Sequence, residues 1–482
     1  MPVILRTTTV KLKENLYVGD GKYASVAYEH KPGRRLVPAA AFAVIAVLSV
    51  TLLVSAAVSK RDGRILATVL PIGVAAVSGM VGYVVAWLLS DVFVVFGVGL
   101  GSRVMSWVAA GFAIAGFAIV HIVLSRGMMR VAAAILTVFA ILAAAIGIDQ
   151  SYGEYATIGS LFGEDSYSQA DLTGLAKRKD LITVAQWRKQ AANGTIRNIP
   201  ANGTVNKIDI PATKSQFEAR KALVYLPPAA LADSKRKPAL PVVLMLSGQP
   251  GSPGRVFQAG GIQTMMDGYA KTHDGLAPIV IAADQLGADS HNTLCVDSKV
   301  YGNALTYLTQ DVVDWVKTNL PAAQDAKDWA IAGFSQGATC SLQIGVNHPD
   351  LFGTMIPTDS EIKPTNGSRQ EMIDRFFDGD TTAYENQVPV NAIRNHAPTH
   401  QMLIIGAGEK DTTSIRNVKT IAPVAAKAGM RVAAVESSGN AHDWHAVQDV
   451  LRYGLAVFGH DTGLDGANPN LSDYPNLKRI TI

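Results

Sequence analysis

The fold is decided by one stretch, Ala330-Ile331-Ala332-Gly333-Phe334-Ser335-Gln336-Gly337-Ala338-Thr339. Its apolar first half predicts a buried strand, and its G-x-S-x-G turn leads into a predicted helix. Such a turn lifts a strained serine Oγ clear of a sheet. The N-terminus of the helix behind the serine offers N–H groups and a positive dipole end, which suit a developing oxyanion. Because glycine and serine are common in turns, the motif alone is also compatible with an ordinary loop.

The overall composition of the chain is unusually apolar. The chain has 482 residues, enough for two or three domains. Hydrophobic residues make up 48% and charged residues 17%, and the mean hydropathy of +0.19 is high for a soluble enzyme of this size. The net charge of +4 is too small to predict nucleic-acid binding. Neither of the two cysteines lies in a C-x-x-C pair, so the sequence predicts no zinc site.

Four uncharged apolar runs predict an α-helical transmembrane region at residues 36–149, after a polar, basic segment at residues 1–35. The runs are Val37–Val58, Ile65–Ser90, Val104–Leu124 and Val131–Ile148. Each comes close to the roughly 20 residues that cross a bilayer core as a helix. The alternative is four buried helices of a soluble bundle, and the absence of a charged face in the sequence of each run argues against it.

The charges between these runs predict the side of the membrane on which the C-terminal half lies. The first and third connections are basic, through Lys60, Arg61, Arg64, Arg126 and Arg130. The positive-inside rule places these two connections in the cytoplasm and the C-terminal half outside. The basic residues before the first run point the other way, because four spans leave both termini on one side. Two connections outweigh one flank, so we expect an extracytoplasmic catalytic domain in a multi-pass membrane protein.

The C-terminal half alternates predicted strands and helices. Residues 150–215 are predicted to be a linker or accessory region, because glycines and turn sequences interrupt them. In residues 216–482, continuous apolar runs such as Pro241–Leu246 and Ile279–Ala283 are typical of parallel strands covered on both faces. This alternation predicts a doubly wound sheet with its site at the carboxyl ends of the strands. Together with the serine turn, it predicts an α/β-hydrolase domain.

An acid and then a histidine are expected to follow the serine along the chain in this fold. The histidine takes the proton of the serine hydroxyl, and the acid holds the histidine in the right tautomer. Asp411 lies in the loop after the predicted strand Met402–Gly406 and is the expected acid, with Glu409 as the alternative. His442 lies in the loop after the next strand and is the expected base, whereas the nearby His445 is expected to be structural.

Two backbone N–H groups are expected to hold the oxyanion. One belongs to Gln336, directly after the serine. The other is expected from Gln249, in the loop Ser247–Gly254 that follows an early strand. The alternative for this loop is an ordinary Gly/Pro turn. Its glycines do not follow the spacing of a phosphate-binding loop.

Two further pairs of residues bear on the compartment and the substrate. In an external domain Cys295 and Cys340 could form a disulfide, and the alternative is two buried thiols. Asp359 and Glu361 lie on a segment that is expected to end near the mouth of the site. Their carboxylates could bind the ammonium group of an aminoacyl ester, and the alternative is a solvated loop with a helix-capping aspartate. The predicted site implies no metal and no organic cofactor.

Residues from about Lys221 to Phe458 resemble the esterase D group of α/β-hydrolases, which includes actinobacterial mycolyltransferases. Three motifs carry the resemblance: Ala332-Gly-Phe-Ser-Gln-Gly-Ala338, His348-Pro-Asp-Leu-Phe352 and His442-Asp-Trp444. They resemble the elbow of the group, the His-Pro-x-x-Phe that ends its elbow helix, and its His-x-Trp signature around the catalytic histidine. Mycolyltransferases are typically secreted without membrane spans. The layout with four spans instead resembles actinobacterial membrane esterases, some of which hydrolyse aminoacylated lipids such as alanyl-phosphatidylglycerol.

The sequence as a whole predicts a membrane-anchored serine ester hydrolase. Its expected substrate and partner is a membrane lipid or an envelope ester, and no nucleic acid. Ser335 is expected to attack the ester carbonyl, and water then releases the acid. One alternative is a mycolyl or acyl transferase of the cell envelope, in which a sugar or lipid hydroxyl replaces water. Another is a non-catalytic membrane-anchored binding module, against which the complete set of Ser335, Asp411 and His442 argues.

Overall fold

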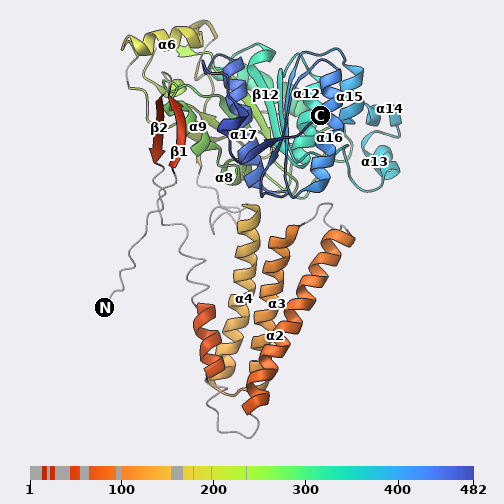
Figure 1. Cartoon of the computed structure of the whole chain (residues 1–482). Helices are drawn as coiled ribbons and strands as arrows, with labels where there is room; N and C mark the ends of the chain where they lie inside the picture. Colours follow the sequence, from red (N-terminus) through yellow and green to blue (C-terminus); the bar gives the residue numbers. More distant parts are fainter. Residues whose placement is uncertain are drawn as a thin grey trace. The chain divides into compact units, whose positions relative to one another are not determined.

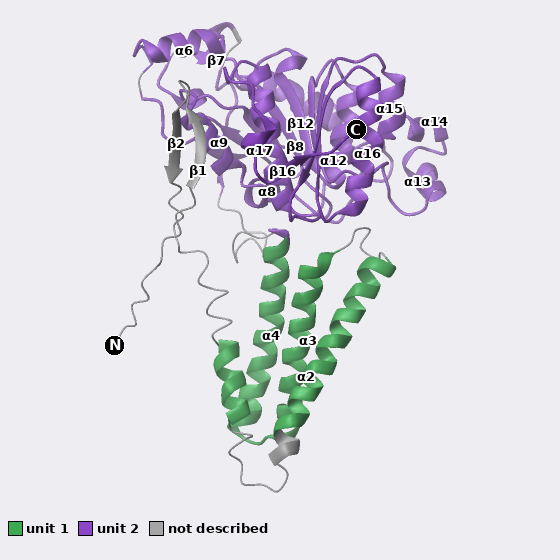
Figure 2. Cartoon of the chain, viewed as in Figure 1, with its two compact units in different colours: residues 1–151 green, residues 152–482 purple. Residues whose placement is uncertain are grey.

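The structure is a computed structural model of the whole chain (Figure 1). It describes residues 13–18, 22–27, 44–54, 64–93, 100–153, 167–176, 178–196, 198–234 and 236–482. The chain divides into two compact units, residues 1–151 and residues 152–482 (Figure 2). Within the first unit, strands β1 (Lys13–Val18) and β2 (Lys22–Ala27) pair as an antiparallel hairpin.

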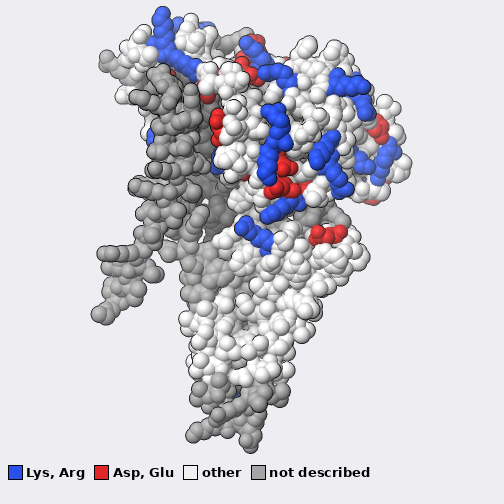
Figure 3. Space-filling model, viewed as in Figure 1, with Lys and Arg blue, Asp and Glu red and all other residues white. Residues whose placement is uncertain are grey.

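Among the described residues, three helices are long and apolar enough to cross a membrane. They are α2 (Arg64–Trp87), which continues as the π-helical η2 (Leu88–Val92), α3 (Gly101–Leu124) and α4 (Met128–Tyr152). Large apolar side chains such as Val77, Met80 and Ile141 are exposed on them. Figure 3 shows charged side chains gathered over the second unit, whereas most of the visible described surface of these helices carries none. A helix surface of this kind is typical of helices that pack against other apolar groups.

In the part of the chain that the structure describes there are three such helices, whereas the sequence predicts four spans. The first predicted span, Val37–Val58, is represented by the shorter apolar helix Val44–Val54, and its flanks lie outside the described residues.

Small residues bring the three long helices of the first unit close together. A Cβ added to Gly116 of α3 would lie 2.4 Å from the Oγ of Ser78 in α2. A Cβ added to Gly111 would lie 2.8 Å from the Cβ of Ala144 in α4. Close packing over glycine, alanine and serine is the usual way in which apolar helices associate without a hydrophobic driving force between them.

The second unit is built on a ten-stranded sheet in the order β16-β15-β14-β13-β12-β8-β9-β6-β5-β3. The strands are β3 (Ser168–Gln169), β5 (Thr204–Ile208), β6 (Ala222–Leu226), β8 (Val242–Leu246), β9 (Ile279–Ala282), β12 (Trp329–Phe334), β13 (Thr354–Thr358), β14 (Met402–Gly408), β15 (Arg431–Ser437) and β16 (Leu477–Arg479). From β9 to β15 every neighbouring pair is parallel. The doubly wound sheet predicted from the alternation of strands and helices is therefore confirmed.

Helices cover both faces of this sheet (Figure 1). The longer ones are α6 (Val184–Ala192), α8 (Pro253–Ala259), α9 (Ile262–Lys271), α11 (Val312–Asn319), α12 (Gln336–Asn347), α13 (Arg369–Phe376), α15 (Pro389–Asn395), α16 (Thr412–Lys427) and α17 (Trp444–Asp461). The shorter ones are α7 (Pro228–Leu231), α10 (Ala304–Thr306), α14 (Thr381–Glu385), η3 (Arg178–Asp180), η4 (Tyr307–Asp311), η5 (Ala326–Asp328) and η6 (Leu471–Asp473). Short strand pairs are formed by β4 (Leu181–Ile182) with β7 (Lys237–Pro238), and by β10 (Asp297–Ser298) with β11 (Gly302–Asn303).

The central strand β12 shows how the two layers arise. All of its residues are buried, and alternate side chains point to opposite faces. Ile331 packs into the core formed with α12 and α16, whereas Ala330 and Ala332 pack into the core formed with α9 and α17. A strand covered on both faces must be apolar throughout, which explains the continuous apolar run before the serine turn.

The chain reverses its direction of growth between β8 and β12. After β8 the chain forms β9 on one side, and it later returns to place β12 on the other side of β8. In open α/β sheets, ligands bind in the crevice at such a reversal, beyond the carboxyl ends of the strands. The loops after β8 and β12 are those that carry Gln249 and Ser335.

The predicted linker or accessory region at residues 150–215 belongs to the second unit from Tyr152 onward. Its strand β5 pairs antiparallel with β6, and β3 adds a further strand at that edge of the sheet. Residues 152–482 form one compact unit.

Candidate active site

Ser335 lies in a sharp turn between β12 and α12. Its backbone has φ +55° and ψ −117°, which is a strained conformation for a residue other than glycine. Its N–H donates to the carbonyl oxygen of Thr358 at 3.0 Å, and its own carbonyl oxygen accepts from the N–H of Thr339 at 3.0 Å. These bonds hold the serine at the carboxyl edge of the sheet, directly before the N-terminus of α12.

The two glycines of the motif are required by close backbone contacts. A Cβ added to Gly333 would lie 2.2 Å from the carbonyl oxygen of Gly337. A Cβ added to Gly337 would lie 2.3 Å from the carbonyl oxygen of Ser247, in the loop after β8. The strand, the helix and the neighbouring loop therefore meet at a distance that leaves no room for a side chain.

We expect Gly337→Ala to lower the free energy of unfolding of the second unit by about 1–3 kcal/mol, because the new Cβ must displace backbone. The matched control is Gly254→Ala in α8, where the nearest atom to an added Cβ is the Oγ of Ser252 at 3.7 Å. Alanine favours helix there, so the control should keep or slightly raise stability. Urea unfolding compares the two, and equal midpoints would contradict the close contact at Gly337.

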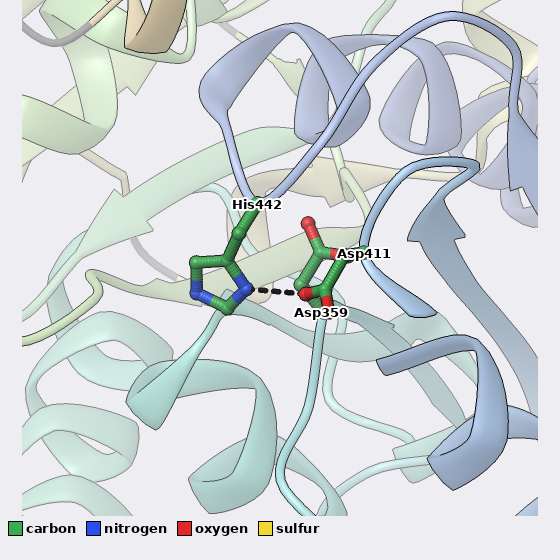
Figure 4. A group of neighbouring side chains, drawn as sticks. All are labelled: Asp359, Asp411 and His442. Carbon is green, nitrogen blue, oxygen red and sulfur yellow. Dashed lines mark hydrogen bonds and ion pairs between the residues drawn. The ribbon is translucent and has the colours of Figure 1, made fainter. Parts of the chain in front are cut away.

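His442 and Asp411 form a direct pair at the same edge of the sheet (Figure 4). Asp411 lies just after β14 and His442 in the loop between β15 and α17, and the distance from His442 Nδ1 to Asp411 Oδ2 is 2.7 Å. The second carboxylate oxygen of Asp411 accepts from the N–H of Ser414 at 3.0 Å and caps α16. With Asp411 ionised, Nδ1 carries the hydrogen and Nε2 keeps its lone pair.

Pairing outweighs burial in the electrostatics of these two groups. Desolvation alone would raise the pKa of Asp411, but the hydrogen bond and charge of His442, together with the bond from Ser414, lower that pKa below its usual range. Desolvation alone would lower the pKa of His442, but the bond to Asp411 and the charges of Asp359, Asp411 and Asp443 raise it. Both effects favour an ionised acid beside a basic imidazole.

Aromatic packing places the imidazole beside the serine turn. The ring of Phe334, the residue before Ser335, lies 4.9 Å from the ring of His442 and 5.0 Å from that of Trp444, between centroids. His445 donates its backbone N–H to Asp443 at the start of α17, so the structure places this second histidine on the helix rather than in the loop.

Glu409, the alternative acid, points elsewhere. Its carboxylate pairs with the ammonium of Lys478 at 2.9 Å and accepts from the N–H of Gly439 at 2.7 Å. Its side chain is 39% exposed, whereas that of Asp411 is 2% exposed. Of the two acids in this loop, Asp411 is the one that contacts His442.

The loop after β8 passes next to the serine. A Cβ added to Gly248 would lie 3.5 Å from the Cβ of Ser335. Gln249 follows, and its side-chain amide donates to the carbonyl oxygen of Ser290 at 3.1 Å. On the other side, α12 begins at Gln336, so the backbone N–H of this residue has no acceptor within the helix. The two residues predicted to hold an oxyanion thus come from elements that flank Ser335.

A buried ion pair that sequence reasoning missed fixes this loop. The guanidinium of Arg220 bonds both carboxylate oxygens of Asp284, at 2.9 and 2.8 Å, and donates to the carbonyl oxygen of Gly251 at 2.9 Å. It also pairs with Asp289. The Asp284 side chain is fully buried. The sequence contains a signal for this pair, because an aspartate follows the buried strand β9 directly and an arginine lies just before β6. Since β6 and β9 are antiparallel neighbours, the start of one lies beside the end of the other.

A disulfide joins Cys295 to Cys340, which lies within α12 one turn after Gln336. The side-chain amide of Gln336 lies 3.2 Å from the sulfur of Cys340 and donates to the Oδ1 of Asn292 at 3.3 Å. Its carbonyl oxygen accepts from Gln285 at 3.2 Å. Through these contacts the first turn of the helix is tied to the loop that carries Cys295.

The two carboxylates expected near the mouth of the site differ in their surroundings. Glu361 is exposed, and its backbone N–H donates to the hydroxyl of Thr339 at 3.0 Å, one turn from Ser335. Desolvation by nearby protein raises the pKa of Glu361 to about 7, an effect that its exposure limits. Asp359 is instead fully buried, so the expectation that it lies at the mouth is wrong. The chain turns inward after β13, which an alternating sequence pattern does not reveal.

Asp359, Asp411 and His442 also have the spacing of cation ligands. One atom from each lies within 4.8 Å of the others, and all three residues are buried or nearly so. His442 Nδ1 is already engaged by Asp411, so a metal could bind only by replacing that hydrogen bond. The arrangement fits an acid–base pair better than a metal centre.

The fold and this site define the class of protein: an esterase of the serine-hydrolase type on an α/β-hydrolase domain. Residues 214–454, half of the chain, match the family described as putative esterase. The chain belongs to this family. An uncharacterized protein of Corynebacterium glutamicum is 32% identical over 333 residues, which cover 67% of this chain and 74% of that protein.

Several solved structures are also similar to about half of the chain. An S-formylglutathione hydrolase from Agrobacterium tumefaciens is 16% identical with a TM-score of 0.45, covering 55% of this chain and 98% of its own. The fluorophosphonate-binding serine hydrolase FphF from Staphylococcus aureus is 13% identical with a TM-score of 0.43, covering 53% and 98%. MPT51 from Mycobacterium tuberculosis is 13% identical with a TM-score of 0.39, also covering 53% and 98%.

Proposed function

We propose that this protein is a membrane-anchored serine ester hydrolase whose catalytic triad is Ser335, His442 and Asp411. The observation that carries the proposal is the 2.7 Å hydrogen bond between His442 Nδ1 and Asp411 Oδ2, beside a serine held in a strained turn before a helix. A histidine oriented in this way keeps Nε2 free to take the proton of a serine hydroxyl. Membership of the esterase family supports the same chemistry.

The reaction follows from these positions. His442 Nε2 takes the proton of Ser335 Oγ as the oxygen attacks the ester carbonyl, and Asp411 stabilises the imidazolium that forms. The backbone N–H groups of Gln336 and Gln249 donate to the oxyanion. The imidazolium then gives its proton to the leaving alkoxide, which departs as an alcohol. Water, deprotonated by His442, attacks the acyl-enzyme and releases the carboxylic acid with free Ser335.

Hydrolysis is tested by incubating the full-length, detergent-solubilised protein with p-nitrophenyl butyrate, with and without a long-chain alcohol. A hydrolase forms butyric acid in both reactions. A transferase forms the butyryl ester of the alcohol instead, because the alcohol then replaces water in the second step. If neither product forms, the site does not cleave esters, and the alternative of a binding module is favoured.

We further propose that the catalytic domain faces the cell envelope. Three described helices are long and apolar enough to anchor the chain, and the disulfide between Cys295 and Cys340 is of the kind that persists in oxidising compartments. The basic connections between the apolar runs support the same side. The fourth span, from the run Val37–Val58, remains part of this proposal.

We expect external protease to cleave at the C-terminus of the protein in intact spheroplasts. Alkylation under denaturing conditions, before reduction, should find no free thiol, because both cysteines are paired in an oxidising compartment. A cytoplasmic marker protein serves as the control for lysis. Protection from the protease together with two alkylated thiols would place the domain in the cytoplasm.

The substrate that the site fits best is an ester with a cationic acyl group, such as an aminoacyl-phosphatidylglycerol. Glu361 supplies an exposed carboxylate whose backbone is linked through the Thr339 hydroxyl to the carbonyl oxygen of Ser335, at 3.0 and 3.2 Å. A carboxylate at this position attracts an ammonium group, and a neutral mycolyl chain gains nothing from it. Asp359 does not take part in this contact because it is buried.

This substrate preference should depend on pH. Desolvation raises the pKa of Glu361 toward about 7, so more of the carboxylate is charged at pH 8 than at pH 6. We expect the KM for glycine betaine ethyl ester, whose charge is fixed, to fall by about two- to fivefold from pH 6 to pH 8, the size of an exposed ion pair.

The matched neutral substrate is ethyl 3,3-dimethylbutanoate, which has the same shape without the charge. Glu361→Gln should abolish the pH-dependent difference between the two esters while leaving the neutral ester unaffected. If Glu361→Gln changes both KM values equally, the carboxylate does not recognise a cation, and the acyl specificity must lie elsewhere.

A further inference from the structure

A second buried acid lies beside the His442–Asp411 pair. Strand β13 runs between β12 and β14, so Asp359, directly after β13, lies between the elements that carry Ser335 and Asp411. The N–H of Ser335 donates to Thr358, and the N–H of Asp359 donates to the carbonyl oxygen of Gly406 at 2.9 Å. Three neighbouring strands thus deliver three reactive side chains to one edge of the sheet.

The surroundings of Asp359 hold it in an unfavourable state. Its backbone has φ +54°, in the left-handed region that residues other than glycine rarely adopt. Its side chain is fully buried. One carboxylate oxygen accepts from the N–H of Gly408 at 2.9 Å, and the other has no hydrogen-bond partner among the residues that the structure describes. A buried carboxylate oxygen without a hydrogen-bond partner lowers the free energy of unfolding, and a functional role is one reason why such a group is retained.

The unpartnered acid is close enough to act on the imidazole. One oxygen of Asp359, one oxygen of Asp411 and one nitrogen of His442 lie within 4.8 Å of one another, and Figure 4 shows the two carboxylates on the same side of the ring. Two carboxylates at this distance do not both ionise readily. The bonds from His442 and Ser414 keep the charge on Asp411, so the proton belongs to Asp359.

The electrostatics of Asp359 agree with this assignment. Desolvation, and then the charge of Asp411, raise the pKa of Asp359 well above its usual range, although His442 and the bond from Gly408 act in the other direction. If the charge of Asp411 is removed, the repulsion disappears while the attraction to the imidazolium remains. The proton of Asp359 is then released to solvent, and its carboxylate faces His442.

We propose that Asp359 is a reserve acid for His442: when Asp411 carries no charge, Asp359 ionises and accepts the Nδ1–H hydrogen bond in its place. This inference rests on the proposed function, in which His442 is the base. Asp359 is a positioning residue, because it acts through His442 and does not contact the reacting atoms. In this arrangement the two carboxylates share one proton and serve one imidazole.

The sharpest test replaces Asp411 by serine. Serine keeps the cap of α16, since its hydroxyl can accept from the N–H of residue 414 as Asp411 does. It also avoids the amide of asparagine, which would occupy Nδ1 and favour the wrong tautomer. We expect Asp411→Ser to lower kcat for p-nitrophenyl butyrate by about 100-fold, less than the roughly 10⁴-fold that loss of the only triad acid costs.

The second variant removes the reserve acid with little change in size. Asp359→Asn alone should lower kcat by less than about fivefold. The double variant Asp411→Ser/Asp359→Asn should show the full loss in kcat of roughly 10⁴-fold. In all three variants KM should stay within about twofold of wild type. A purely structural residue would cost the same factor in both backgrounds. A single Asp411→Ser variant as inactive as the double variant would overturn the proposal.

A second measurement does not depend on the folding of an Asp411 variant. The carboxyl groups that interact with His442 belong to Asp359, Asp411, Asp443 and Glu361. While Asp411 is charged, Asp359 holds a proton and adds no charge beside the imidazole, so Asp359→Asn should leave the acid limb of kcat/KM where it is in wild type. A limb that moves to lower pH would show that Asp359 is already charged beside Asp411, and would contradict the proposal. Wild type and Ser335→Ala are assayed alongside as controls for the proposed function. An inactive wild type, or an active Ser335→Ala variant, would contradict the proposed function rather than the role of Asp359.

Discussion

Ser335→Ala is expected to lower kcat on p-nitrophenyl esters by a factor on the order of a million, the size of loss when a serine hydrolase loses its nucleophile. The alanine still fits the strained turn, because Ser335 is held there by backbone bonds to Thr358 and Thr339. The residual rate comes from binding and from the backbone donors of the oxyanion site. The free energy of unfolding should stay close to that of wild type.

The matched control is Ser341→Ala, a serine within the helix α12 that follows Ser335. The Oγ of Ser341 is buried and donates to the carbonyl oxygen of Ala338 at 2.8 Å, and the side chain lies outside the proposed catalytic group. This variant should keep most of its activity. Near-wild-type turnover by Ser335→Ala would show that the nucleophile has been misassigned.

Asp411→Asn is expected to lower kcat by roughly 10⁴-fold, because an amide N–H beside Nδ1 holds the imidazole in the tautomer that cannot take the serine proton. The side chain keeps its size and can still cap α16, so stability should change little. The Asp411–His442 distance of 2.7 Å explains the size of the effect. Measurement of kcat across pH separates this loss from a shift in the pH optimum.

Glu409→Gln is the control for the same loop. Glu409 pairs with Lys478 at the surface, an interaction of little energetic weight. We expect activity within about twofold of wild type, since exposed substitutions away from a site have small effects. A larger loss for Glu409→Gln than for Asp411→Asn would move the role of the acid to Glu409.

The parts of the site that were predictable from sequence follow from local rules. The G-x-S-x-G turn is local, and the contacts at Gly333 and Gly337 show why no other residues fit there. Asp411 and His442 were found from their order along the chain, since each lies in the loop after a predicted strand. The doubly wound sheet followed from the alternation of apolar runs, because strands such as β12 are buried on both faces.

The parts that were missed depend on contacts between distant segments. Arg220 and Asp284 are 64 positions apart and meet only because β6 and β9 are neighbours in the sheet. Asp359 looks like a loop residue in the sequence, and only the inward turn after β13 buries it beside His442. The apolar run Val37–Val58 has the composition of a span, and of this run the structure describes the helix Val44–Val54.

The residue that a fluorophosphonate probe modifies shows directly whether Ser335 is the nucleophile. The full-length protein in detergent is treated with the probe, digested and analysed by tandem mass spectrometry. We expect one adduct, on Ser335 in the peptide that contains it. Labelling should fail in His442→Ala, because the serine proton then has no acceptor. An active esterase labelled at any other residue, or not labelled at all, would contradict the role of Ser335.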